Sequence, residues 1–165
     1  MSVSNVTRER LWDRIERLAD TARDSAGGIT RLEYTGEASA GRSLVKKWME
    51  AAGLSVTVDP IGNIFGRLEG SNPEAGAVLL ASHIDSVPQG GRFDGPLGVL
   101  AALEAVETLV EQGRQPAKPV EVGVFVNEEG ARFEGGLLGS RAVTRGVTPG
   151  FLRELVDDDG VSCYQ

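Results

Sequence analysis

The sequence predicts an α/β domain, because segments with strand-like and helix-like patterns alternate along the chain. Residues 77–81 and 120–126 are two apolar runs typical of strands in the core of a sheet. Between them, the segment from Pro96 to about Gly113 is apolar on nearly every side, as expected of a helix buried against that sheet. A chain of 165 residues, 41% hydrophobic and 25% charged, is expected to fold as one domain.

Two helices are predicted in the first third of the chain. Apolar residues recur at helical spacing in the first helix, namely Leu11, Ile15, Leu18 and Ala22. This helix is expected to begin near Thr7 and to end before Gly27. The second helix is marked by Leu44, Trp48, Met49 and Ala52, with Ser39 as the expected N-cap and Gly53 just past the end.

After the second helix, the apolar pattern changes to an alternation with period two, which predicts two short strands. Val56 and Val58 mark the first strand, and Ile64 and Leu68 mark the second. A turn between them predicts a hairpin. The run at 77–81 is then expected to be a strand buried on both faces, and residues 151–156 predict a short last helix.

Composition excludes several classes of function. A net charge of −7 disfavours nucleic acid as a partner, because binding to phosphates requires clustered Lys and Arg. The acidic run at 157–159 is typical of a solvated turn rather than a metal site. The single cysteine, Cys163, rules out an intramolecular disulfide and favours a reducing compartment. No signal peptide and no apolar stretch of roughly 20 residues is present, so a cytoplasmic protein without a membrane partner is expected.

Ionisable side chains follow both predicted core strands. His83 and Asp85 come after the first of these strands, and Glu128 and Glu129 come after the second. Because open α/β sheets bind ligands at the carboxyl ends of their strands, we expect these side chains to converge with Asp94 from the loop before the helix. Imidazole and carboxylate groups are typical ligands of zinc, manganese and cobalt. The sequence therefore predicts a metal centre at this edge.

Each of these residues also allows a structural interpretation. His83, the single histidine, fits an ordinary core or surface position, although Asp85 shares its face of an extended segment and can fix its tautomer. Asp94 can stabilise the amino terminus of the following helix or bridge two cations. Glu128 and Glu129 can be solvated loop residues, or one can bind metal while its neighbour takes a proton from metal-activated water. No Gly-x-Ser-x-Gly elbow supports a covalent nucleophile.

Three motifs, taken in order, resemble those of a known enzyme family. They are Ser82-His-Ile-Asp-Ser-Val-Pro88, Gly90-Gly-Arg-Phe-Asp-Gly95 and Asn127-Glu-Glu-Gly-Ala-Arg-Phe133. Together they resemble the hydantoinase/carbamoylase branch of the M20-type metallohydrolases. The similarity covers most of the chain from about Thr30 onward.

This resemblance implies the amino-terminal part of a Zn-peptidase-like catalytic domain, with a central mixed sheet flanked by helices. It implies two divalent metal ions (zinc, manganese, cobalt or nickel), with His83 binding one, Glu129 the other, and Asp94 bridging both. Glu128 would act as general base and acid, and Asp85 would orient His83. The substrates would be small molecules with a linear amide or ureido C–N bond, such as N-carbamoyl-L-amino acids, β-ureidopropionate and allantoate.

The resemblance also implies groups that these 165 residues do not contain. Family members are homodimers of much longer chains, in which each metal takes one further histidine and an inserted lid and dimerisation domain supplies an arginine. Residues 1–165 are therefore expected to form a single, incomplete catalytic domain without the inserted domain, with impaired activity and a tendency to self-associate. Two alternatives stay open: an M20-type aminopeptidase or dipeptidase, and a non-catalytic half that pairs with a separate carboxyl-terminal chain.

Overall fold

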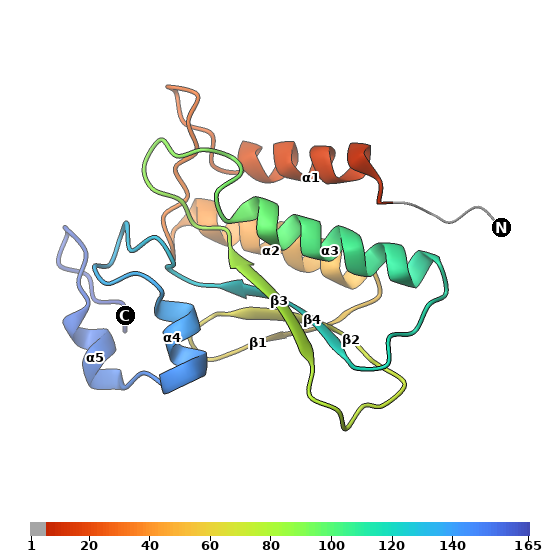
Figure 1. Ribbon diagram of the computed structural model, residues 1–165. Coiled ribbons are helices and arrows are strands. Elements are labelled where there is room, and N and C mark those ends of the chain that lie inside the picture. The colour runs from red at the N-terminus through yellow and green to blue at the C-terminus, as the bar shows by residue number, and fades with distance from the viewer. Residues whose placement is uncertain (1–5) are drawn as a thin grey trace.

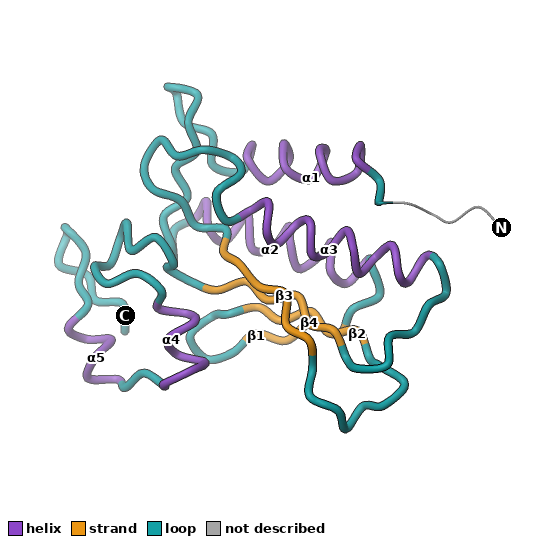
Figure 2. Tube along the Cα trace, in the orientation of Figure 1, coloured by secondary structure: helices purple, strands orange, loops and turns teal. Residues whose placement is uncertain are grey.

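A mixed sheet with helices packed on one of its faces forms the centre of the structure, a computed structural model that describes residues 6–165 (Figure 1). In chain order the elements of this part are α1 (Arg8–Asp20), α2 (Gly36–Ala51), β1 (Ser55–Val58), β2 (Ile64–Leu68), β3 (Val78–His83), α3 (Pro96–Glu111), β4 (Val120–Phe125), α4 (Leu138–Arg145) and α5 (Pro149–Glu154). Figure 2 shows how strands and helices alternate between long loops. The predicted α/β fold is confirmed.

The strands of the described chain lie in the order β1-β2-β4-β3. β1 pairs antiparallel with β2, with Val58 opposite Ile64, so the predicted hairpin is confirmed. β2 is also antiparallel to β4, whereas β3 and β4 run parallel, with His83 opposite Phe125. Because parallel neighbours end at the same edge, the loops that follow β3 and β4 leave the sheet side by side.

One hydrophobic core fills the space between the sheet and its helices. α2 covers β1 and β2, α3 covers β3 and β4, and α1 packs against the outer side of α3 (Figure 1). Fully buried residues from these layers form the core, among them Val45, Met49, Ile64, Leu100, Leu103, Val122 and Val124. Burying each such side chain stabilises the fold by roughly 1.5–3 kcal/mol.

The prediction that residues 77–81 form a strand buried on both faces is wrong. β3 is an edge strand that pairs with β4 alone within the described chain. Val78, Leu79 and Leu80 are 46%, 43% and 37% exposed, and no further strand of residues 6–165 lies beyond β3. The apolar helix α3 is likewise buried along one side, while its Leu97 is 42% exposed.

Helix boundaries differ from the prediction at several places: α1 ends at Asp20, before the predicted Ala22, and α5 spans Pro149–Glu154 rather than residues 151–156. α2 starts one turn earlier than expected, because the side chain of Thr35, rather than that of Ser39, accepts the capping hydrogen bond from Ala38 N. α4 has no counterpart in the sequence prediction, since it begins in a glycine-rich stretch after Leu137, which has a left-handed conformation with φ 65°.

The acidic run at 157–159 is also more than a solvated turn. Asp157 accepts from Arg132 Nε at 3.1 Å and from the main-chain N–H groups of Asp159 and Val161. These contacts hold the pKa of Asp157 below its usual value, with the hydrogen bond from Val161 as the largest cause. Among residues 6–165, no helix has both the length and the apolar composition needed to cross a membrane.

Candidate metal centre

Three of the predicted site residues meet where β3 and β4 end. His83 is the last residue of β3, Asp94 lies in the loop just before α3, and Glu129 follows β4. One ligand atom from each of the three lies within 4.8 Å of the others. His83 is buried, Glu129 is half-buried and Asp94 is exposed, so the group opens to solvent on one side. The geometry brings the three together, and metal ligation itself stays a prediction.

Both ring nitrogens of His83 face acceptor groups. Nδ1 lies 3.1 Å from the main-chain oxygen of Asp85 and 3.5 Å from its Oδ1, so the carbonyl is the closer acceptor. Nε2 lies 3.4 Å from Oε2 of Glu128. A proton on Nδ1 would leave the Nε2 lone pair directed to the open side of the site.

Gly95 explains why Asp94 can lie so close to His83. A Cβ atom at Gly95 would lie 2.5–2.6 Å from three ring atoms of His83, and the backbone has φ 82°. Glycine is therefore required on both counts, steric and conformational. Gly95 is also the N-cap residue of α3, which has no side-chain cap hydrogen bond, so the structure shows no capping contact from Asp94.

Asp85 links the two loops that leave the sheet. Its side chain is 2% exposed, and its Oδ2 accepts from the main-chain N–H of Glu129 at 3.0 Å. Its other oxygen, Oδ1, is buried without a hydrogen-bond partner among the described residues and faces His83 Nδ1. One carboxylate thus contacts both His83 and the backbone of Glu129.

The charges around the site raise two pKa values. Burial alone lowers the pKa of His83, but the hydrogen bond and charge of Asp85 and the charge of Glu128 outweigh it, and the net shift is upward. The pKa of Glu129 is raised, first by burial and then by repulsion from Asp94, Glu128 and Asp85, against the opposing charge of His83. Four carboxylates next to an imidazole form a site that a cation would stabilise.

Comparison with known proteins places this site in a family. The family model described as peptidase family M28 matches residues 63–154, more than half of the chain. An N-carbamoyl-L-amino acid amidohydrolase from Geobacillus stearothermophilus is 48% identical over 93% of this chain and 37% of its own length. A crystal structure of a hydantoinase/carbamoylase family amidase from Burkholderia multivorans superimposes with a TM-score of 0.92 at 37% identity, over 99% of this chain and 40% of that one.

The chain belongs to the hydantoinase/carbamoylase family of amidases. A ureidoglycolate hydrolase from Oryza sativa subsp. japonica is 39% identical over 96% of this chain and 33% of its own length. The chain therefore spans about two fifths or less of the length of these relatives. The family that the motifs resemble is therefore confirmed. The family model that matches the chain is described under another name, peptidase family M28.

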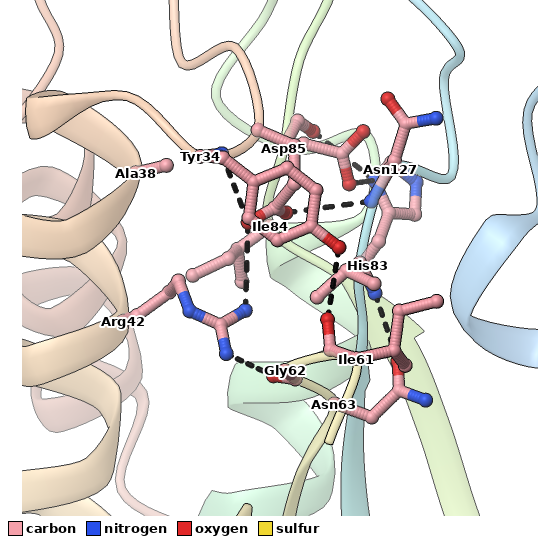
Figure 3. A network of polar contacts seen from close by, with 12 residues as sticks. Tyr34, Ala38, Arg42, Ile61, Gly62, Asn63, His83, Ile84, Asp85 and Asn127 are labelled. Carbon is pink, nitrogen blue, oxygen red and sulfur yellow. Dashed lines mark hydrogen bonds and ion pairs between the residues drawn. The ribbon is translucent and has the colours of Figure 1, made fainter. Parts of the chain in front are cut away.

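Polar residues behind the candidate metal centre were not predicted. Arg31 donates from Nη1 to the oxygen of Ile84 at 2.8 Å, and its main-chain N–H donates to Ser86 Oγ at 2.9 Å. Glu33 continues this buried layer, with its carboxylate 3.6 Å from Arg42 and accepting from Asn127 N. Figure 3 shows Arg42 and Asn127 within this network. No local pattern marks Arg31 or Glu33 in the sequence, since partners such as Ser86 for Arg31 and Asn127 for Glu33 lie more than 50 residues away.

Proposed function

We propose that this chain carries the metal-binding half of a hydrolase that cleaves linear amide or ureido C–N bonds. The substrate class is that of N-carbamoyl-L-amino acids, β-ureidopropionate or allantoate. The observation that carries this proposal is the grouping of His83, Asp94 and Glu129 within 4.8 Å in a chain of the hydantoinase/carbamoylase family. The names of the relatives, which include an N-carbamoyl-L-amino acid amidohydrolase and a ureidoglycolate hydrolase, support the substrate class.

The residues present fit divalent metal ions. One imidazole nitrogen and two carboxylates are ligands that zinc, manganese and cobalt accept. The buried, unpartnered Oδ1 of Asp85 faces His83 Nδ1, as expected of a group that holds a ligating histidine in one tautomer. In our proposal, His83 and Glu129 bind different ions and Asp94 bridges them; nickel is a further candidate ion.

Glu128 is placed to move protons. Its side chain is 33% exposed, reaches His83 and lies outside the group of three ligands. A divalent cation in this site would act as a Lewis acid on the substrate carbonyl and would make water more acidic. Glu128 would accept a proton from the attacking water and return it to the leaving nitrogen. Asp85 would keep His83 and the backbone of Glu129 in place during this transfer.

We further propose that residues 1–165 are one part of a single catalytic domain. His83 is the single histidine of these residues, so two ions would have to share three protein ligands. A stable zinc site usually takes about four ligands, three of them from protein even in catalytic sites. Groups outside these residues, in the same polypeptide or a second chain, would complete both ions, and the chain alone would have impaired activity. Cytoplasmic location and the lack of a nucleic-acid partner also remain predictions.

The match to peptidase family M28 favours a second candidate function, an aminopeptidase or dipeptidase. The same ligands and general base would serve peptide hydrolysis, because the C–N bond is again cleaved by activated water. Substrate preference separates the two functions. An N-carbamoyl-L-amino acid and a dipeptide of the same residue should be compared under identical metal conditions.

The first experiment is a titration of the metal-free chain with zinc and with manganese. We expect binding that weakens by about 100-fold in His83→Ala, because the ligand set loses its imidazole. Glu134→Ala is the matched control for Glu129→Ala, since Glu134 is an exposed acidic residue of the neighbouring loop. Glu129→Ala should weaken binding and Glu134→Ala should not.

Hydrolysis of the N-carbamoyl substrate should be slow and should disappear in Glu128→Gln, which keeps the shape of the side chain but cannot accept the proton. Equal metal affinity in the wild type and His83→Ala would contradict the proposed centre. Efficient hydrolysis by the chain alone would contradict the proposed need for outside groups.

A further inference from the structure

The carboxylate of Glu33 is buried behind the site and has no part in the chemistry proposed above. Its side chain is 1% exposed and belongs to the segment that leads into α2. We propose that Glu33 is a positioning residue that fixes the loop of Glu128 and Glu129, so that both carboxylates point into the metal centre. This inference rests on the proposed function, because the loop matters only if those two residues act there.

The side chain of Glu33 holds the beginning of the loop. Its Oε2 accepts from the main-chain N–H of Asn127 at 3.4 Å, across 94 positions of sequence. Asn127 directly precedes Glu128 and has a left-handed conformation with φ 46°. Asparagine tolerates that conformation better than most residues, yet it still needs support from its surroundings. A carboxylate fixed beneath the Asn127 N–H group supplies that support.

The main chain of Glu33 holds the other end of the same loop. Its carbonyl oxygen accepts from Arg132 Nη1 at 3.0 Å. The side chain of Asn127 closes the base of the loop by donating to the Phe133 oxygen at 3.2 Å. Residue 33 therefore contacts the loop at both ends, and Glu128 and Glu129 lie between these two contacts.

Arg42 balances the buried charge of Glu33. Its Nη1 lies 3.6 Å from Oε1 of Glu33, and its Nη2 donates to the Gly62 oxygen (Figure 3). The same Oε1 accepts from the main-chain N–H of Tyr34 at 3.3 Å. With these partners, the carboxylate is fixed from below by α2 and from the side by its own backbone, so it is a rigid support.

The loop is held from above by the site itself. Oδ2 of Asp85 accepts from Glu129 N, two residues after the N–H that Glu33 holds. The backbone that carries Glu128 and Glu129 is thus fixed between two buried carboxylates. Loss of the Glu33 carboxylate would leave Asn127 free to relax from its left-handed conformation. That change would rotate Glu128 away from His83.

Cobalt(II) is the probe for this proposal, because its visible absorption reports both affinity and the set of ligands. The 165-residue chain is compared with Glu33→Ala, Glu33→Gln and the control Glu37→Ala, an exposed acidic residue nearby. We expect Glu33→Ala to weaken cobalt binding about 10- to 100-fold and to change the absorption spectrum. Glu33→Gln keeps an acceptor for Asn127 N–H but loses the pairing with Arg42, so its loss should be intermediate. Glu37→Ala should match the wild type.

Hydrogen exchange of the Asn127 and Glu129 amides in the metal-free protein gives a second readout. Exchange at both should be about tenfold faster in Glu33→Ala and unchanged in Glu37→Ala. A Glu33→Ala protein that melts earlier, yet has wild-type cobalt affinity and wild-type exchange at these amides, would overturn the proposal. If Glu33→Ala does not fold, Glu33→Gln decides by the same criteria. If the wild type binds no cobalt, the proposed function fails for this chain, and the amide exchange still tests Glu33.

Discussion

Oxygen atoms with negative charge or partial charge lie beside both ring nitrogens of His83. The main-chain oxygen and Oδ1 of Asp85 lie near Nδ1, and Oε2 of Glu128 lies near Nε2. In the metal-free protein, these groups favour the protonated ring and raise its pKa above the ordinary value of 6.5. A cation would compete with that proton for Nε2. In the proposed metal centre, the same residue would link proton binding, folding stability and metal affinity.

This link predicts a pH dependence of the metal-free fold. Because the folded pKa of His83 is raised, its contribution to stability is fully present below about pH 6.5 and is lost as pH rises through the folded pKa. Urea unfolding in a chelator, repeated from acidic to alkaline pH, measures this contribution as the difference between the wild type and His83→Gln. We expect the wild-type advantage to shrink with rising pH, whereas metal affinity should grow. If the wild type became more stable relative to His83→Gln as pH rises, the raised pKa of His83 would be contradicted.

Residues of the site differed in how far the sequence could predict them. His83, Asp94 and Glu129 could be expected to converge, because they flank strands and a helix whose patterns are clear. Glu33 could not, because a charged residue in a segment without periodicity is ordinarily placed at the surface. Its burial depends on Arg42 and Asn127, and neither contact is visible in the local sequence.

At the scale of elements, α1 and α3 are joined by a buried ionic network. Glu104 on α3 has a side chain that is 1% exposed and accepts from Arg10 Nε at 2.7 Å and from Thr7 N at 2.7 Å. Arg14 Nη1 lies 3.6 Å from the same carboxylate. One carboxylate on α3 thus fixes the amino-terminal end of α1, on the side of α3 that faces away from the sheet.

We expect Glu104→Ala to lower the free energy of unfolding by roughly 2 kcal/mol, because Arg10 and the Thr7 N–H lose a buried charged acceptor, while Arg10 keeps Glu111 and Arg14 keeps Glu107. Asp13→Ala is the control, since the pair of Asp13 with Arg17 is 62% and 55% exposed and its loss should cost less than about 1 kcal/mol. Equilibrium denaturation of both variants gives the comparison. If Glu104→Ala and Asp13→Ala lowered the free energy of unfolding equally, the ionic network would not be what holds α1 against α3.

The type of most helices and strands could be predicted from their own residues, but the neighbours that bury or expose them could not. The hairpin of β1 and β2 and the helix α3 follow from periodicity and from a first-turn proline, both of which are local features. The exposure of β3 cannot be predicted from its own residues, because it depends on which strands and helices lie beside it. α4 was not predicted, because the glycines before it are typical of a loop and its N-cap residue, Leu137, has a left-handed conformation.

At the scale of the whole molecule, the open edge of β3 predicts self-association of this chain. An edge strand whose residues Val78, Leu79 and Leu80 are apolar and exposed has the features that favour pairing with a second copy. Leu79→Lys should reduce association, because a lysine on an edge strand opposes further pairing. Leu97→Lys is the control, since Leu97 is 42% exposed but lies on α3.

Sedimentation velocity over a range of protein concentrations measures this association. The wild type and Leu97→Lys should form larger species as concentration rises, and Leu79→Lys should remain smaller. A wild-type chain that stays monomeric at every concentration would contradict the prediction.

All five candidate site residues lie within residues 83–129, from the end of β3 to the loop after β4. The parallel pairing of β3 with β4 therefore assembles the half-site in a single event, across the crossover that contains α3. Long-range parallel pairings are slow to form, because the loop between the strands must close before the pairing stabilises it. A metal ion present during synthesis would favour this register over its competitors. If the proposed metal centre forms at this stage, metal supply would affect how much of the newly made polypeptide reaches the native state.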